Sequence, residues 1–303
     1  MMDPRISPIA RRISVAVIAT TVASLAAGCS QGRASSPAPA PAATSAEAAT
    51  GTTAQAATDP ADPATWRLPM EAYLPTDEEY RRYGKAMHAR VSECMRKAGY
   101  TPQPLVDVPP IGGSTLTDRR YGIHDETLSA KRGYHVDAQQ QAAYDAAMQE
   151  SAVSKLGPEG NRAEFECGTR SKHWFGGGDR TLGALAQELG NDAFLRAKRE
   201  PEVVAAFKAW SSCMKERGYS YKEPFDANDD PRMTGREVSK AEIDTALADI
   251  ACRTRTDVAK IWYDAEVRLQ KDAFDKQAPA LQAERKELDA ILKKTADVLG
   301  GTR

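Results

Sequence analysis

The segment between Asp226 and Glu237 has the spacing of a metal-binding motif. Four of its side chains occupy positions 1, 3, 5 and 12 of a calcium-binding loop: Asp226, Asn228, Asp230 and Glu237. The sixth position of such a loop makes a sharp turn and needs glycine, but here it is Pro231, whose φ is fixed at a negative value. We therefore interpret the segment as a polar connection between helices and expect no metal site.

The histidines are the other candidates for metal binding or proton transfer: His88, His124, His135 and His173. His124 and His135 flank a short predicted helix, so their rings can come together, with Asp125 or Asp137 nearby. Hydrogen bonds that cap helices or hold loops explain the same residues without catalysis. The chain also lacks the HExxH, GxSxG, GxGxxG and GxxxxGK[ST] motifs. We expect no catalytic residue, cofactor or metal.

The segment HWFGGGDR, residues 173–180, is rich in glycine directly after two aromatic residues. This composition suits a ligand-binding loop. It also suits a mobile connection between helices, since no strand precedes the glycines as in a phosphate-binding loop. Both interpretations remain open at this point.

A cysteine motif is written twice in the chain. CMRKAGY at 94–100 returns as CMKERGY at 213–219, and each copy ends a predicted amphipathic helix. Gly99 and Gly218 suit the left-handed conformation that stops a helix, and the next residue, a tyrosine, then packs back on the last turn. The motif therefore has a sufficient structural explanation.

The partner cysteines repeat as well, because Cys167 begins CGTR and Cys252 begins CRTR. The repeated order predicts two related units, at about 76–180 and about 200–299. Of three possible connectivities, it favours Cys94 with Cys167 and Cys213 with Cys252. Each bridge is expected to stabilise the fold by roughly 4 kcal/mol in the chain-entropy treatment.

Helical spacing dominates the remaining pattern and predicts an all-α fold. Thr76 with Glu79, and Ser239 with Glu242, form capping boxes at helix starts. An apolar stripe from Ile243 to Leu269 predicts a long C-terminal helix, which Pro279 breaks. We expect the final segment, 280–299, to project into solvent or to pack on a partner. Shorter helices are predicted at 125–133, from 137, at 182–189 and at 193–199.

The first 28 residues are typical of a signal peptide, since Arg5, Arg11 and Arg12 precede an uncharged run that is too short to span a bilayer. The run ends in LAAGC, residues 25–29, which resembles the lipobox of bacterial lipoproteins, with the leucine one place further from the cysteine than is common. The resemblance implies that Cys29 becomes the lipidated first residue. Ordinary cleavage, which leaves Cys29 as a free thiol, is the alternative, and the Arg pair leaves Sec or twin-arginine export open.

Residues 29–65 are composed mainly of Ala, Pro, Thr and Ser. Such a segment has too little apolar surface to fold, so we predict a disordered tether between the lipid anchor and a helical domain at 66–303. Lipidation would place this domain on the outer face of the cytoplasmic membrane, where disulfides persist. The 41 basic and 42 acidic residues, a net charge of −1, provide no broad basic surface for nucleic acid.

Three features taken together resemble a group of uncharacterised exported proteins and lipoproteins of high-GC actinobacteria. They are the paired CMxxxGY motifs, the segment RRYGIHDETLSAKRGYH at 119–135, and the run ALADIACRTR at 246–255. The resemblance covers about 71–299 and implies export and disulfides. It carries no established activity.

We therefore expect a non-catalytic accessory module that contacts the lipid bilayer through Cys29 and binds an envelope protein or a cell-wall component. The alternative is an extracellular hydrolase that uses residues of the insertion at 101–135. A solute-binding protein of a transporter is disfavoured, because the strand–helix alternation of its two lobes is missing.

Overall fold

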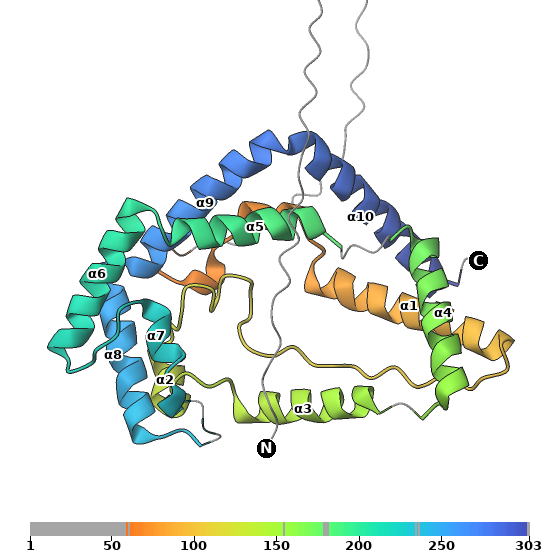
Figure 1. The fold of residues 1–303 in the computed structure, drawn as a ribbon, viewed down its shortest axis with the longest axis horizontal. Coiled ribbons are helices and arrows are strands. Elements are labelled where there is room, and N and C mark those ends of the chain that lie inside the picture. Colours follow the sequence, from red (N-terminus) through yellow and green to blue (C-terminus); the bar gives the residue numbers. More distant parts are fainter. Residues whose placement is uncertain are drawn as a thin grey trace, which may run out of the picture. The chain divides into compact units, whose positions relative to one another are not determined.

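The computed structural model describes residues 59, 61–153, 155–177, 182–233, 235 and 237–301. The predicted signal peptide, Cys29 and most of the predicted tether lie outside these ranges. The described residues are helical and contain no strand, which confirms the all-α fold (Figure 1). The α-helices are α1 (Asp77–Lys97), α2 (Glu126–Arg132), α3 (Ala138–Ala152), α4 (Pro158–Phe175), α5 (Ala184–Ala197), α6 (Pro201–Glu216), α7 (Pro224–Asn228), α8 (Lys240–Thr256), α9 (Val258–Lys276) and α10 (Ala278–Leu299), with 3-10 helices η1 (Pro63–Thr65), η2 (Pro69–Tyr73) and η3 (Pro231–Met233).

Two disulfides brace the helices in the pairing that the duplication predicted. Cys94 of α1 is joined to Cys167 of α4, with their Cα atoms 5.7 Å apart. Cys213 of α6 is joined to Cys252 of α8, with their Cα atoms 5.6 Å apart. Each predicted unit therefore contains one cross-linked pair of packed helices.

The glycines of the repeated motif end α1 and α6 in the predicted way. Gly99 has a φ of 86° and Gly218 a φ of 91°, values that side chains with a Cβ rarely adopt. The last turn of each helix is closed by an amide–carbonyl hydrogen bond: Tyr100 N to Met95 O at 3.0 Å, and Tyr219 N to Met214 O at 2.9 Å. The repeated motif therefore has a structural role: it ends a helix directly after the cysteine that forms a disulfide.

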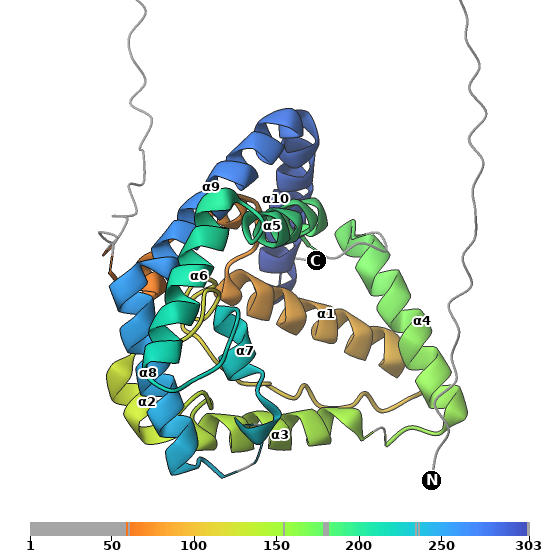
Figure 2. The ribbon, with the colours of Figure 1, turned by 60° about the vertical axis from the view of Figure 1, so that its left-hand side comes forward.

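The C-terminal stripe forms separate helices. Asp257, with a φ of 51°, separates α8 from α9, and Pro279 lies in the first turn of α10. The expectation that the last segment projects into solvent or onto a partner is wrong, because α10 packs on α1 of the same chain (Figures 1 and 2). Leu281, Leu288 and Ile291 of α10 are buried, and Ile291 lies in one apolar cluster with Ala86 of α1.

Two predicted boundaries differ from the structure. The helices expected at 182–189 and 193–199 are one continuous helix, α5, which runs through Gly190, where Met70 of η2 packs too closely for a Cβ. The predicted end of the tether at 65 is too late, because Asp62 caps η1 and Pro63 is buried. Trp66 follows directly and is buried in the main core.

The insertion at 101–135 belongs to the core of the second unit. Tyr121, Ile123 and Tyr134 are buried in the same cluster as Trp210 and Trp262. The helix of this insertion, α2, packs against α8 (Figure 2). The insertion is therefore held in place by the C-terminal helices. Its residues form most of the wall of the candidate site.

Candidate functional site

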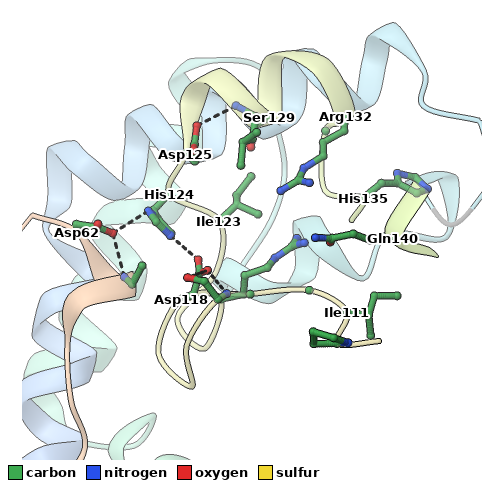
Figure 3. A pocket seen from close by; sticks show the side chains of 18 of the residues that line it. Asp62, Ile111, Asp118, Ile123, His124, Asp125, Ser129, Arg132, His135 and Gln140 are labelled. Carbon is green, nitrogen blue, oxygen red and sulfur yellow. Dashed lines mark hydrogen bonds and ion pairs between the residues drawn. The ribbon is translucent and has the colours of Figure 1, made fainter. Parts of the chain in front are cut away.

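A cavity of about 530 Å³ lies between α2 and the loop that precedes it (Figure 3). Its wall consists of residues from η1, the insertion and the first turns of α1 and α3. The residues that line it include Asp62, Asp77, Ile111, Ser114, Asp118, Arg119, Ile123, His124, Asp125, Leu128, Arg132, Gly133 and His135. Both histidines that the sequence singled out therefore border one cavity.

Glu266 of α9 anchors the start of the segment that forms this wall. Its carboxylate is fully buried and accepts three hydrogen bonds from the Arg120 guanidinium, at 3.1 and 3.0 Å from Nε and at 2.7 Å from Nη2. The Tyr121 hydroxyl donates to the same carboxylate at 2.7 Å, and the Gln270 amide donates to it at 2.7 Å. A bidentate guanidinium–carboxylate pair fixes both the distance between the two groups and their relative orientation. The pair therefore holds the backbone at Arg120 and Tyr121 in place.

Asp249 of α8 anchors the core beside α2. The carboxylate accepts hydrogen bonds from Arg253 Nε at 2.7 Å, from Trp210 Nε1 at 2.8 Å and from the Tyr134 hydroxyl at 3.2 Å. Burial raises the pKa of Asp249, against the opposing effect of Arg253. Arg253 also donates to the backbone carbonyl of Tyr121. Tyr121 and Tyr134, which lie before and after α2, are thus both held by the buried Asp249–Arg253 ion pair.

Glu242, at the start of α8, holds the end of the insertion. The predicted capping box is only half formed, because Ser239 accepts from the Glu242 amide at 3.1 Å while the Glu242 carboxylate points elsewhere. That carboxylate accepts from the Tyr134 amide at 2.9 Å and from His135 Nδ1 at 2.7 Å. Gly133 has a φ of 56°, and a Cβ there would collide with Glu242. Only glycine allows this approach.

His135 is held at both ring nitrogens. Nδ1 donates to Glu242, and Nε2 donates to the carbonyl of Gly235 at 2.7 Å. Burial disfavours the charged ring, but the Gly235 carbonyl and the Glu242 carboxylate outweigh it and raise the pKa of His135. Because both ring nitrogens face acceptor oxygens, the geometry favours the doubly protonated ring, and neither nitrogen is free to act as a base.

The raised pKa of His135 predicts a pH-dependent stability. The stabilisation is fully present below the unfolded-state pKa of about 6.5 and is lost as the pH rises through the higher folded-state pKa. We expect the free energy of unfolding to fall over that window in the wild type and to change less in His135→Gln. Urea unfolding at a series of pH values measures this. His173→Gln, at an exposed position in α4, is the control, and an unchanged pH slope in His135→Gln would contradict the assignment.

His124 is held separately, by carboxylates on the opposite side of the pocket from His135 (Figure 3). Its Nε2 lies 2.8 Å from Asp118 Oδ1, and its Nδ1 lies 3.5 Å from Asp62 Oδ1. Asp118 also accepts from the Ser114 amide and hydroxyl, at 2.5 and 2.9 Å. Burial raises the pKa of Asp118, but the bonds from His124 and Ser114 lower it on balance. The two rings therefore do not come together, and each is held by its own hydrogen bonds, in line with the non-catalytic interpretation.

Arg119 and Arg132, which also line the cavity, differ from the two histidines because they form no ion pair with a carboxylate of the described residues. Arg119 donates through Nη2 to the Tyr134 carbonyl at 2.6 Å, and burial together with nearby Arg132 lowers its pKa. The Arg132 side chain points from α2 into the pocket (Figure 3). Within the described ranges, no carboxylate forms an ion pair with either guanidinium. Sequence reasoning missed both residues, although both lie in the quoted segment 119–135.

The other predicted positions are engaged in local structure. Asp226 accepts from the amides of Lys222 and Glu223 at 2.9 Å, and Asp230 pairs with Arg232 at 2.5 Å. No cluster of metal-ligating side chains occurs among the described residues. The carbonyl of Gln103 lies 2.9 Å from a ring nitrogen of His88. Residues 178–180 of the HWFGGGDR segment lie outside the described ranges.

Comparison with known proteins does not extend this description. No protein-family profile matches the chain, and no curated protein or solved structure is significantly similar to it. In the part of the chain that the structure describes, no helix combines the length and the apolar character needed to cross a bilayer.

Proposed function

We propose that this chain is a non-catalytic binding module of the cell envelope, anchored to the outer face of the cytoplasmic membrane through lipid on Cys29, and that the cavity beside α2 is its ligand site. The observation that supports the binding role is which polar groups of the pocket already have partners within the protein. Both histidines have oxygen partners at both ring nitrogens, whereas Arg119 and Arg132 have no carboxylate partner among the residues that the structure describes.

This distribution favours binding over proton transfer. A general base must present a free nitrogen or oxygen to the group that it deprotonates. His135 donates both protons to protein oxygens, and His124 lies between Asp118 and Asp62. Arginine stays charged at ordinary pH and is poorly suited to acid–base chemistry, but it binds anionic groups well. The pocket therefore supports holding a ligand better than the alternative of a hydrolase in the insertion.

The placement in the envelope is supported by sequence features. LAAGC at 25–29 resembles a lipobox, and the segment that follows has the composition of a tether. Two disulfides suit a protein folded in an oxidising compartment. The resemblance to exported actinobacterial lipoproteins implies the same placement. The lipid bilayer and an envelope component are the partners that this proposal includes.

Native mass spectrometry of the full chain extracted from membranes tests both parts of the proposal. We expect an acylated form, with diacylglycerol and palmitate-type chains on Cys29, that retains an envelope molecule. Leu128→Trp should displace this molecule, because Leu128 lines the cavity and the larger ring would occupy part of the space that the ligand needs. The retained molecule should leave the protein chemically unchanged.

Leu195→Trp is the control, because Leu195 is also an exposed helical leucine but lies on α5 outside the lining of this cavity. Retention by the wild type and this control, with loss in Leu128→Trp, supports the proposal. Equal retention by all three proteins would place the ligand elsewhere. Turnover of the retained molecule would overturn the non-catalytic role, and an unmodified Cys29 would overturn the anchor.

A further inference from the structure

We infer that the ligand of this pocket is an organic acid, whose oxyanion binds between Arg119 and Arg132 and whose apolar part lies against Ile111, Ile123 and Leu128. The inference rests on the binding role proposed above and adds the chemical class of the ligand. The shared chemistry is a terminal carboxylate or phosphate monoester on a short apolar body.

The arginine pair provides the anion-binding half. Two like charges in a partly buried wall repel each other, and a bound anion between them removes that repulsion. Arg119 uses one of its donors on the Tyr134 carbonyl, which positions the guanidinium and leaves its other N–H groups for a ligand. Arg132 is half-buried and points into the cavity from the last turn of α2 (Figure 3). Planar guanidinium groups match the geometry of carboxylate and phosphate oxygens.

Asp118 is near enough to favour the charged form of Arg119, but within the described residues no acidic residue of the wall forms an ion pair with Arg119 or Arg132. Asp118 is engaged by Ser114 and His124, and Asp62 accepts from the Ala64 amide at 2.9 Å. Asp125 accepts from the Leu128 amide at 2.8 Å and caps α2. Asp77 is exposed in the first turn of α1, where the helix dipole favours a negative charge. Glu242 pairs with His135, so the positive charge of that ring is already balanced.

The apolar half of the wall explains why a small inorganic ion is not the whole ligand. The cavity of about 530 Å³ has the size of pockets that hold organic molecules. Ile123 and Leu128 both line the cavity, where Ile123 is buried and Leu128 is 40% exposed. Covering Leu128 and Ile111 with an alkyl chain would remove apolar surface from water, at about 25 cal/mol per Å². An anionic end and an apolar body therefore match the two parts of the wall.

Isothermal titration calorimetry of the full chain with hexanoate, hexyl phosphate and uncharged hexanamide tests the inference. We expect saturable binding of at least one of the two acids and none of hexanamide, because only the acids present an oxyanion. Arg132→Gln should weaken the binding about tenfold or more, since a hydrogen-bonded charge is lost. Binding of hexanoate alone identifies a carboxylate site, and binding of hexyl phosphate alone identifies a phosphate site.

Arg96→Gln is the matched control, because Arg96 is an exposed arginine in the last turn of α1 and does not line the cavity. Arg132→Lys keeps the charge, loses the planar pair of donors and should show intermediate affinity. Equal binding by the wild type and Arg132→Gln, equal binding of hexanamide, or no binding of either acid would overturn the inference. If the acids fail to bind but Leu128→Trp still displaces an envelope molecule, the organic-acid inference is wrong and the proposed binding role is kept.

Discussion

Glu266→Ala is expected to lower the free energy of unfolding by about 3–5 kcal/mol, because breaking a buried ion pair leaves its partner charged and unpaired. The carboxylate of Glu266 is fully buried and holds Arg120, Tyr121 and Gln270. Loss of the carboxylate leaves the Arg120 guanidinium, whose side chain is 13% exposed, without a carboxylate partner. Urea unfolding followed by far-ultraviolet circular dichroism, with the disulfides intact, measures the change.

Asp272→Ala is the control for this prediction, because Asp272 is an exposed carboxylate on the same helix, α9. It removes an equal charge and should change the stability by less than about 0.5 kcal/mol. Adding Arg120→Met to Glu266→Ala should recover part of the loss, since the unpaired charge is then gone. A loss below about 1 kcal/mol in Glu266→Ala would show that this buried network does not anchor the insertion.

Replacing Cys213 and Cys252 together by alanine is expected to cost about 4 kcal/mol, within a range of about 2–5 kcal/mol for native disulfides. The bridge closes a loop across 39 residues, and both cysteines are fully buried in the main core. It joins α6 to α8, the helix that carries Glu242 and Asp249. We therefore expect this variant to lose ligand affinity as well as stability.

The Cys94–Cys167 pair provides the comparison for this experiment. It closes a loop across 73 residues, so the chain-entropy treatment predicts a similar loss of stability when both cysteines become alanine. It joins α1 to α4, away from α8, so affinity for hexanoate or hexyl phosphate should be kept. Equal losses of affinity in the two double variants would show that the pocket does not depend specifically on the α6–α8 bridge.

The local architecture could be predicted from the sequence because its signals are short-range. Thr76 and Glu79 form the predicted capping box, and Gly99 and Gly218 stop helices as their φ freedom suggests. The disulfide pairing followed from the repeated order of motifs. In each case a few neighbouring residues, or their repetition, contain the information.

The anchoring of the insertion could not be predicted from the same pattern. Hydrophobic periodicity assigns the buried face of α8 to residues such as Ile243 and Leu247, yet both are only half-buried. Glu242 and Asp249 are buried instead, because the insertion provides hydrogen-bond donors more than 100 residues away in the chain. A buried carboxylate looks like a surface residue until its partners are known.

The pocket was only partly visible in the sequence, for a related reason. His124 and His135 drew attention because of their chemistry, and both line the cavity. Their engagement with separate carboxylates depends on tertiary contacts. Arg119 and Arg132 lie in a charged segment where a solvated position is the ordinary expectation. They become candidates for anion binding only because, within the described residues, the structure places no carboxylate in an ion pair with either of them.

Nuclear magnetic resonance of the arginine Nε–H groups during a titration of the full chain with hexanoate and hexyl phosphate tests the central claim most directly. Assignment of Arg132 follows from the signal that disappears in Arg132→Gln. We predict a saturable shift of the Arg132 and Arg119 signals with at least one acid, no shift with hexanamide, and an unchanged Arg96 signal. Arg132 and Arg119 signals that stay constant throughout both titrations would contradict the claim that this pocket binds an organic acid through its arginine pair.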